Sequence, residues 1–231
     1  MAERHRRVGV VIPAGGKGLR LGGRVPKQFL PIHGKPVLLH TLLVFEASPQ
    51  VDEVVIVAAR EQIRRVRKLV RNSLLTKVSS VVPGGKERQD SVWNGMLAFS
   101  SPPDIVLVHD AVRPLLRGSM IKEVVRVCIK SSAAVVAVRV KDTIKTERVK
   151  GFFARTMERS KLWAVQTPQC FQTDLLMKAH RAARQTGFLG TDEASLVERL
   201  GVPVRIVEGD YRNIKITTRD DLALAGMWLK R

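Results

Sequence analysis

Short apolar runs alternate along the chain with segments whose apolar residues recur at helical spacing. The apolar runs are rich in β-branched residues, which is typical of buried strands. They lie at residues 8–12, 53–58, 77–82, 104–109 and 133–140. The segments with helical spacing lie between them, at residues 37–47, 61–71, 90–100 and 119–132. This alternation predicts an α/β fold: a Rossmann-like, mostly parallel twisted sheet flanked by helices.

The pattern changes after residue 140. Alternating segments flank Lys150-Gly151, which predicts an extended hairpin or arm over residues 141–160. Such an arm cannot bury its own side chains, so we expect it to protrude and to pack on a second subunit in a homodimer. The alternative is a surface hairpin on a monomer. Further helices are predicted at 174–185, at 192–200 and after Thr217-Thr218, and further strands at 204–209 and 213–217.

The totals fit this organisation. A chain of 231 residues, 45% of them hydrophobic, suits one packed domain over residues 1–231, with the arm as an insertion. No apolar run is long enough to span a bilayer, and no apolar signal-peptide core follows the basic start, so we expect a cytoplasmic protein without a membrane partner. Cys128 and Cys170 lack metal-site or disulfide spacing, and Cys128 is interpreted as a buried thiol.

The formal net charge of +19 indicates anionic partners, either nucleic acid, a membrane surface or phosphorylated small molecules. The densest basic stretch, residues 61–71, also carries apolar residues at helical spacing. This combination predicts an amphipathic helix with a solvated basic face rather than a dedicated nucleic-acid site.

The stretch GVVIPAGGKGLRLGGRVPKQ, residues 9–28, places glycines and cations at the end of the first predicted strand. It lacks the GK[ST] of a P-loop and the register of a dinucleotide-binding loop. Glycine amides can bind phosphate oxygens, and Arg20 and Lys27 add charge to the same loop. The pattern favours a bound polyphosphate over its alternative, a flexible surface loop. The loops at 84–88 and 109–114 also follow predicted strands, at the sheet edge where such folds bind ligands.

PAGGKGLRLGGRVPKQFLPIHGKPVLLHTL resembles the signature of nucleotidyltransferases that activate sugar or polyol phosphates. Further motifs are similar to those of the 2-C-methyl-D-erythritol 4-phosphate cytidylyltransferase family and occur in that family's order. They are GGKERQDSVWNGM, HDAVRP, VKDTIK, TPQCF, TDEASLVE and NIKITTRDDL. The motifs extend from about residue 8 to the last predicted helix.

The resemblance implies transfer of CMP from CTP to a polyol phosphate, with release of pyrophosphate and a requirement for Mg²⁺ or another divalent cation. Catalysis of this kind depends on positioning and on fixed positive charge. Arg20 and Lys27 match the family's residues that stabilise the transition state. Arg159 and Lys215 match those that hold the incoming phosphate, although Arg159 taken alone could be an ordinary surface arginine. In the predicted strand 213–217, Lys215 would point away from its isoleucine neighbours, into the pocket.

The resemblance also implies a CTP site built from small groups. Its residues are Pro13, Ala14, Gly15, Gly16, Gly18, Gly85 and Ser91. Ser91 could equally be a helix residue that follows a cap at Asp90. Lys86 stands where some relatives carry an acid, which affects the expected contacts to ribose.

Asp110 and Arg113 match residues of the family's polyol site, and Asp110 could also help to hold hydrated Mg²⁺. The alternative for these two residues is a mutual ion pair. Asp142 and Thr143, at the base of the arm, match residues that reach a partner's active site.

The histidines show no metal-ligand or triad pattern and are interpreted as structural. Thr191 is the expected cap of the helix at 192–200.

Three alternatives remain for the function. One is a ribitol-5-phosphate cytidylyltransferase, which shares much of the CTP loop. Another is a sugar-1-phosphate nucleotidyltransferase that uses a different base. The third is a nucleic-acid-binding protein on a nonfunctional scaffold, although the chain has no recognised nucleic-acid motif and only one tyrosine.

Overall fold

A seven-stranded sheet forms the centre of the protein, whose structure is a computed structural model that describes residues 5–16 and 25–229. The strand order is β11-β7-β10-β6-β1-β4-β5. These strands are β1 (Val8–Pro13), β4 (Glu53–Ala58), β5 (Val78–Pro83), β6 (Ile105–Val108), β7 (Ala133–Arg139), β10 (Trp163–Gln172) and β11 (Arg205–Glu208). Neighbouring strands run parallel except where β10 pairs with β6 and β7. The predicted mostly parallel α/β sheet is therefore confirmed.

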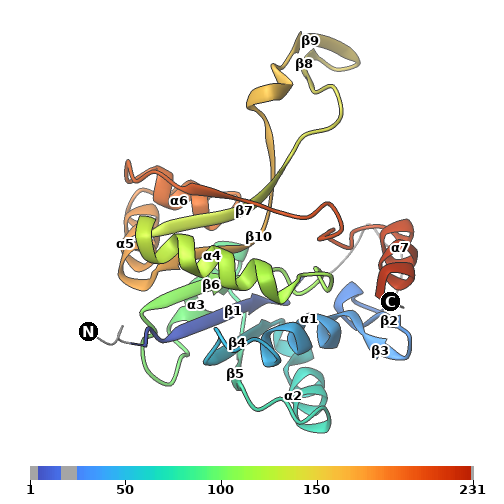
Figure 1. The fold of residues 1–231 in the computed structure, drawn as a ribbon, viewed down its shortest axis with the longest axis vertical. Helices are drawn as coiled ribbons and strands as arrows, with labels where there is room; N and C mark the ends of the chain where they lie inside the picture. The colour runs from blue at the N-terminus through green and yellow to red at the C-terminus, as the bar shows by residue number, and fades with distance from the viewer. Residues whose placement is uncertain (1–4, 17–24, 230–231) are drawn as a thin grey trace.

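Helices cover both faces of this sheet (Figure 1). On one face lie α1 (Val37–Glu46), α2 (Ile63–Asn72) and α4 (Gly118–Ser131). On the other lie α3 (Arg88–Met96), α5 (Thr173–Gln185) and α6 (Glu193–Glu198). Because side chains alternate along a strand, Val10 and Ile12 of β1 belong to the first core and Val11 to the second. The strands are therefore buried on both sides, which explains their continuous apolar runs.

A third, smaller core lies beside the carboxyl ends of the strands. Its buried residues are Ile32 of β2 (Pro31–Ile32), Val37 of α1, Val112, Ile216 and Ala225 of the last helix, α7 (Arg219–Leu229). The short strand β3 (Lys35–Pro36) pairs with β2. This core anchors the chain around residue 216 next to the loop that follows β6, and so links two segments that are far apart in the sequence.

The predicted hairpin is present and protrudes from the body (Figure 1). Strands β8 (Lys145–Val149) and β9 (Phe152–Thr156) pair antiparallel around Gly151, and every residue of both strands is exposed. Its exposed side chains include three large apolar ones, with relative exposures of 63% for Val149, 72% for Phe152 and 77% for Phe153.

Two predictions about strands are wrong. Residues 213–217 form no strand, and residues 163–172, for which no strand was predicted, form β10 in the middle of the sheet. β10 contains Gln166, Thr167, Pro168 and Gln169, which interrupt the apolar run that marks the other strands. The three polar members are nevertheless buried, because each finds a hydrogen-bond partner outside the sheet.

The expected helix caps are displaced along the sequence. Asp90 is not the N-cap of α3: the N-cap is Glu87, and Asp90 completes a capping box from the third helical position. The cap of α6 is Asp192 rather than Thr191, because the Asp192 carboxylate accepts a hydrogen bond from the backbone N–H of Ser195 at 3.0 Å.

The basic stretch at residues 61–71 is helical, as predicted. In α2, Val66 is buried, whereas the arginines and Lys68 of the same helix are exposed. Within residues 5–16 and 25–229, none of the helices has the length and apolar character that crossing a bilayer requires.

Candidate active site

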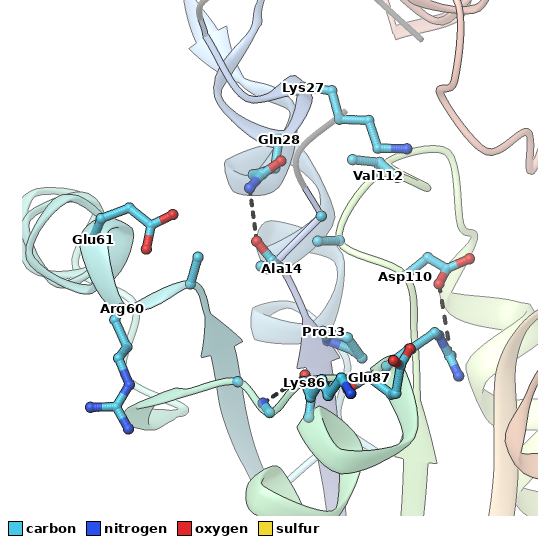
Figure 2. A pocket seen from close by; sticks show the side chains of 18 of the residues that line it. Pro13, Ala14, Lys27, Gln28, Arg60, Glu61, Lys86, Glu87, Asp110 and Val112 are labelled. Atoms are coloured by element: carbon cyan, nitrogen blue, oxygen red, sulfur yellow. Dashed lines mark hydrogen bonds and ion pairs between the residues drawn. The ribbon is translucent and has the colours of Figure 1, made fainter. Parts of the chain in front are cut away.

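A pocket of about 840 Å³ opens at the carboxyl ends of β1, β4, β5 and β6, a volume suited to a small ligand. Most of the predicted site residues line it: Pro13, Ala14, Gly15, Gly16, Lys27, Gly85, Ser91, Asp110 and Lys215. Figure 2 shows Arg60 and Glu61 on one side of the pocket and Asp110 and Val112 on the other, with Ala14 between them. The sheet edge expected to bind a ligand is therefore the edge that is hollowed.

Backbone groups form one side of the pocket, the backbone wall, made of residues 13–16 and 84–85. The Ala14 N–H donates to the carbonyl of Val57 at 2.6 Å, which extends the β1–β4 ladder into the loop. The buried amide of Gln28 donates to the Ala14 carbonyl at 2.8 Å (Figure 2). The path of the chain after β1 is thus fixed from both sides.

Gly85 makes the second part of the backbone wall possible. A Cβ atom at this position would lie 2.2 Å from the Cβ of Asp90, so only glycine lets the loop lie against the start of α3. The Gly85 N–H donates to the hydroxyl of Ser91 at 3.1 Å, and that hydroxyl donates to the Glu87 carbonyl. Ser91 is therefore both a helix residue and part of the pocket lining.

Charged side chains form another part of the lining, the charged wall, made of Arg88, Asp110 and Lys215, with Arg113 behind Asp110. The Asp110 carboxylate lies 3.1 Å from Lys215 Nζ, 3.2 Å from Arg113 Nε and 3.8 Å from Arg88 Nη2. Burial by itself would raise the pKa of the Asp110 carboxyl, but the charges of Lys215, Arg88 and Arg113 outweigh it and hold this pKa well below its usual range. Asp110 is consequently ionised near pH 7.

Arg113 lies behind the pocket rather than on its surface. Its Nε donates to Asp110 and its Nη1 donates to the backbone carbonyl of Asn213 at 2.7 Å. The ion pair that the sequence left as an alternative is thus present, and it lies against the pocket because Asp110 also lines the cavity.

Arg88 is a cation of the pocket that sequence reasoning did not select. Its Nη1 donates to both carboxylate oxygens of Glu193, at 2.7 and 2.8 Å, and Glu193 is only 1% exposed. Burial raises the pKa of Glu193. For Arg88, burial alone would lower the pKa, but the negative charges of Glu193 and Asp110 outweigh burial and leave the pKa raised. Both residues lie in quoted motifs, GGKER and TDEAS, but nothing in the spacing shows that the two motifs meet.

Lys27 and Lys215 approach the pocket from different elements. Lys27 begins a short 3-10 helix, Lys27–Phe29, and its Nζ donates to the Ile216 carbonyl at 3.1 Å. Lys215 lies on the segment that was wrongly predicted to be a strand, yet it lines the pocket as expected, with its side chain 42% exposed. Neighbouring Ile216 is buried in the third core, so the two side chains do point in different directions.

The remaining predicted residues lie elsewhere. Asp142, Thr143 and Arg159 are exposed at the base of the arm and do not line this pocket. The Arg159 guanidinium donates to the Lys141 carbonyl at 2.7 Å and so joins the two sides of the arm's base. Gly18 and Arg20 fall outside the described residues.

Buried His109 is linked by hydrogen bonds to Arg113 and, through Thr167, to Asp110. The carbonyl of Arg113 can only accept, so His109 Nε2, at 3.1 Å, carries the proton, and Nδ1 accepts from the Thr167 hydroxyl at 3.0 Å. That hydroxyl in turn accepts from the Asp110 N–H at 3.1 Å. Burial lowers the pKa of His109 to about 4, so the ring stays neutral near pH 7. No group of three or more histidine, cysteine, aspartate or glutamate side chains forms a metal site in the described part of the chain.

The arrangement defines a class of protein. A cleft at the carboxyl ends of parallel strands, lined by backbone groups and by lysines and arginines, suits a phosphorylated nucleotide and a second anion. The fold and the site are those of an α/β nucleotidyltransferase.

Comparison with known proteins identifies the family. The family described as "IspD: 2-C-methyl-D-erythritol 4-phosphate cytidylyltransferase" matches residues 8–231. The chain is 50% identical over 223 residues to the 2-C-methyl-D-erythritol 4-phosphate cytidylyltransferase of Symbiobacterium thermophilum, covering 96% of this chain and 93% of the relative. The chain belongs to this family, as the motifs predicted.

Solved structures agree with this assignment. The crystal structure of 2-C-methyl-D-erythritol 4-phosphate cytidylyltransferase from Thermus thermophilus is similar with a TM-score of 0.80 at 33% identity, covering 97% of this chain and 100% of that one. That of 4-diphosphocytidyl-2C-methyl-D-erythritol synthase from Anaerococcus prevotii gives a TM-score of 0.85 at 26% identity, covering 98% and 100%.

Proposed function

We propose that this protein transfers CMP from CTP to 2-C-methyl-D-erythritol 4-phosphate and releases pyrophosphate, a step of isoprenoid biosynthesis. Its membership of the family supports the reaction. The observation in the structure that carries it is the convergence of Lys27 and Lys215 on one pocket that is also lined by the backbone of residues 13–16 and 84–85.

The chemistry requires little beyond positioning and charge. A phosphate oxygen of the polyol phosphate attacks the α-phosphorus of CTP and forms the new P–O bond. The bond from that phosphorus to the oxygen bridging it to the β-phosphorus breaks, and pyrophosphate leaves with the electron pair. The nucleophile is already an anion, so no strong general base is needed. The obstacle is repulsion between two anions, which fixed cations offset.

We assign the backbone wall and Ser91 to the cytidine, as the family resemblance implies. Lys27, together with Arg20, would stabilise charge on the triphosphate, and Lys215 would hold the attacking phosphate. Unit charges 4 Å apart interact by about 4 kcal/mol at an effective dielectric constant near 20, so each well-placed cation matters. Asp110 and Arg113 would hold Lys215 in place, and Asp110 would also face the polyol hydroxyls.

The described residues do not form a cage for a divalent ion. Asp110 is the carboxylate proposed for this role, and it already has three cationic neighbours. Mg²⁺ keeps several waters and binds readily to substrate phosphates. We therefore propose that the ion arrives with the CTP phosphates, and that any contact with Asp110 passes through water.

The arm supports a homodimer. Exposed Val149, Phe152 and Phe153 would otherwise leave an apolar patch in water. We propose that the arm packs on a second copy and brings Asp142, Thr143 and Arg159 to the partner's pocket, because they do not line the pocket of their own chain. Replacing both Phe152 and Phe153 with serine should halve the mass measured by light scattering. An unchanged mass would refute this role and favour the lone surface hairpin.

We further propose that residues 1–231 act as one domain in the cytoplasm. The two main cores share one sheet, and Cys128 and Cys170 are free and buried, which fits a reducing compartment.

The test of the function is pyrophosphate release from CTP with 2-C-methyl-D-erythritol 4-phosphate and, in parallel, with ribitol 5-phosphate. We expect turnover with the first substrate and at most weak turnover with the second. Activity with ribitol 5-phosphate alone would overturn the assignment.

A further inference from the structure

Asn213 lies next to the pocket and has a buried side-chain amide, to which the proposed reaction gives no role. Its side chain is 0% exposed, and its Nδ2 donates to the Thr167 carbonyl at 2.9 Å and to Gln166 Oε1 at 3.2 Å. Its Oδ1 is buried without a hydrogen-bond partner among the described residues. Leaving a buried acceptor unpaired costs about 1–3 kcal/mol, so stability alone does not favour this amide here.

The segment that contains Asn213 carries Lys215 without the support of a β-ladder. Three contacts to its backbone replace that ladder. Arg113 Nη1 donates to the Asn213 carbonyl at 2.7 Å, the Ile216 N–H donates to the Val112 carbonyl at 2.9 Å, and Lys27 Nζ donates to the Ile216 carbonyl at 3.1 Å. The Asn213 side chain adds a further attachment, to the bulged part of β10 where the register shifts between Val165 and Gln169.

These contacts form a closed loop that includes Lys215, the lysine proposed to bind the attacking phosphate. Lys215 Nζ contacts Asp110, Asp110 contacts Arg113, and Arg113 contacts the backbone two residues before Lys215. Asp110 attracts the ammonium group, but the flexible four-carbon stem can reach it from many backbone positions. Only the attachments of the backbone decide from which direction the ammonium enters the pocket.

We propose that Asn213 is a positioning residue that acts through Lys215 by clamping residues 213–216 to β10. A displacement of about 1 Å in a group that aims a reactant can reduce a rate by about 10²-fold. The inference rests on the proposed function, because Lys215 must hold the attacking phosphate for its position to matter.

The first experiment compares the wild type with Asn213→Ala and Asn213→Leu, the second of which restores apolar volume without the donor. We expect kcat/KM for 2-C-methyl-D-erythritol 4-phosphate to fall at least 10-fold in both, with KM for CTP within twofold of the wild type. Full activity of Asn213→Leu would show that only volume matters and would overturn the proposal.

Asn94, in α3 and not among the residues that line the pocket, offers a control with the same kind of bond. Its Nδ2 donates to the Pro83 carbonyl at 3.2 Å, the same kind of amide–carbonyl bond. Asn94→Ala should leave the kinetics in the polyol phosphate unchanged. An equal loss in Asn94→Ala would indicate general loosening of the fold and would contradict a specific role for Asn213.

A double-mutant cycle separates positioning from structure. In a Lys215→Ala background, Asn213→Ala should cost less than threefold in kcat/KM, because the group that it positions is gone. Independent effects that multiply would overturn the proposal. If Asn213→Ala does not fold, Gln166→Leu removes one acceptor of the clamp, and we expect a smaller loss in the same parameter. No loss in Gln166→Leu would then count against the clamp.

A readout that needs no turnover keeps this inference separate from the function. The Lys215 side chain is 42% exposed and its ammonium is held by Asp110, so an amine-acylating reagent should label it several-fold faster in Asn213→Ala than in the wild type or in Asn94→Ala, as measured by peptide mass spectrometry. If Lys215 is labelled faster in Asn213→Ala but the wild type releases no pyrophosphate, the proposed function is contradicted and the positioning role of Asn213 is not. Unchanged labelling would overturn the inference even if the wild type is active.

Discussion

The two walls of the pocket are built in different ways. The backbone wall continues paired parallel strands, and its polar groups are main-chain atoms that glycine leaves accessible. The charged wall depends on side chains from the loop after β6, from α3 and from an unpaired segment, which hold one another through a buried anion. The first is rigid because of the sheet, and the second is rigid only while each of its members is present.

This difference suits the two substrates. A nucleotide base can be read by main-chain donors and acceptors that never change their protonation. An attacking phosphate must be held by cations, which would repel one another without Asp110 between them. We therefore expect substitutions on the two walls to separate the kinetics of CTP from those of the polyol phosphate.

The largest effect is expected from Asp110→Asn, which removes the shared anion of the charged wall. Breaking a buried pair costs about 3–5 kcal/mol, because the remaining charges are left without a partner. Both the free energy of unfolding and kcat/KM for the polyol phosphate should fall, the latter by about 10²–10³-fold. Asp174→Asn, at an exposed position in the first turn of α5, is the control. A change in kcat/KM of less than threefold in Asp110→Asn would contradict this account of the charged wall.

On the backbone wall, Gly85→Ala should act on CTP. The added Cβ would lie 2.2 Å from the Asp90 Cβ, so the loop must move. Overpacking of this kind costs about 1–3 kcal/mol. KM for CTP should rise by about 10–100-fold, whereas KM for the polyol phosphate should stay within twofold. Gly118→Ala, where a Cβ meets nothing within 4 Å, should leave both KM values unchanged. A larger effect on the polyol phosphate than on CTP would reverse the assignment of the walls.

Acid should loosen both walls through one buried histidine behind each. His109 supports the charged wall, and His180 packs against Trp93 of α3, which carries part of the backbone wall. Burial lowers the pKa of each ring to about 4, below the ordinary value of 6.5. The unfolded chain therefore binds more protons between pH 6.5 and pH 4, and stability must fall as the pH falls through that window.

Each histidine should contribute a loss of about 2 kcal/mol by pH 5. Glu193, whose pKa burial raises, acts in the opposite direction. Urea unfolding at pH 7.5, 6 and 5 measures the slope. His180 has no hydrogen-bond partner among the described residues, so His180→Leu removes one titrating ring with little other change and should make the slope shallower. The same slope in both proteins would contradict this role for His180.

The sequence was a good guide to the backbone wall and a poorer one to the charged wall. The parallel strands are local apolar runs, and the loops that follow them must meet at one edge, so residues 13–16 and Gly85 were predictable. β10 was not, because its central residues are polar and their burial depends on partners such as Asn213 and Asp192 that are distant in sequence.

Residues 213–217 show the opposite error. Alternating Ile214 and Ile216 resemble a strand, but Ile216 packs against α7 and Val112, and the segment pairs with no strand of the sheet. Only the tertiary structure shows that Arg113 and Asn213 replace the missing ladder. The pairing of Arg88 with Glu193 was hidden for the same reason, since the two residues are 105 positions apart.

The most direct test of the central claim is the rate of pyrophosphate release from CTP and 2-C-methyl-D-erythritol 4-phosphate in Lys27→Ala and Lys215→Ala. Removing one preorganised group that stabilises developing charge typically costs about 10²–10³-fold. We predict a fall of at least 10² in kcat/KM for each variant and no change for Lys35→Ala, an exposed lysine away from the pocket. Turnover that survives both substitutions would contradict the claim that fixed cations drive this reaction.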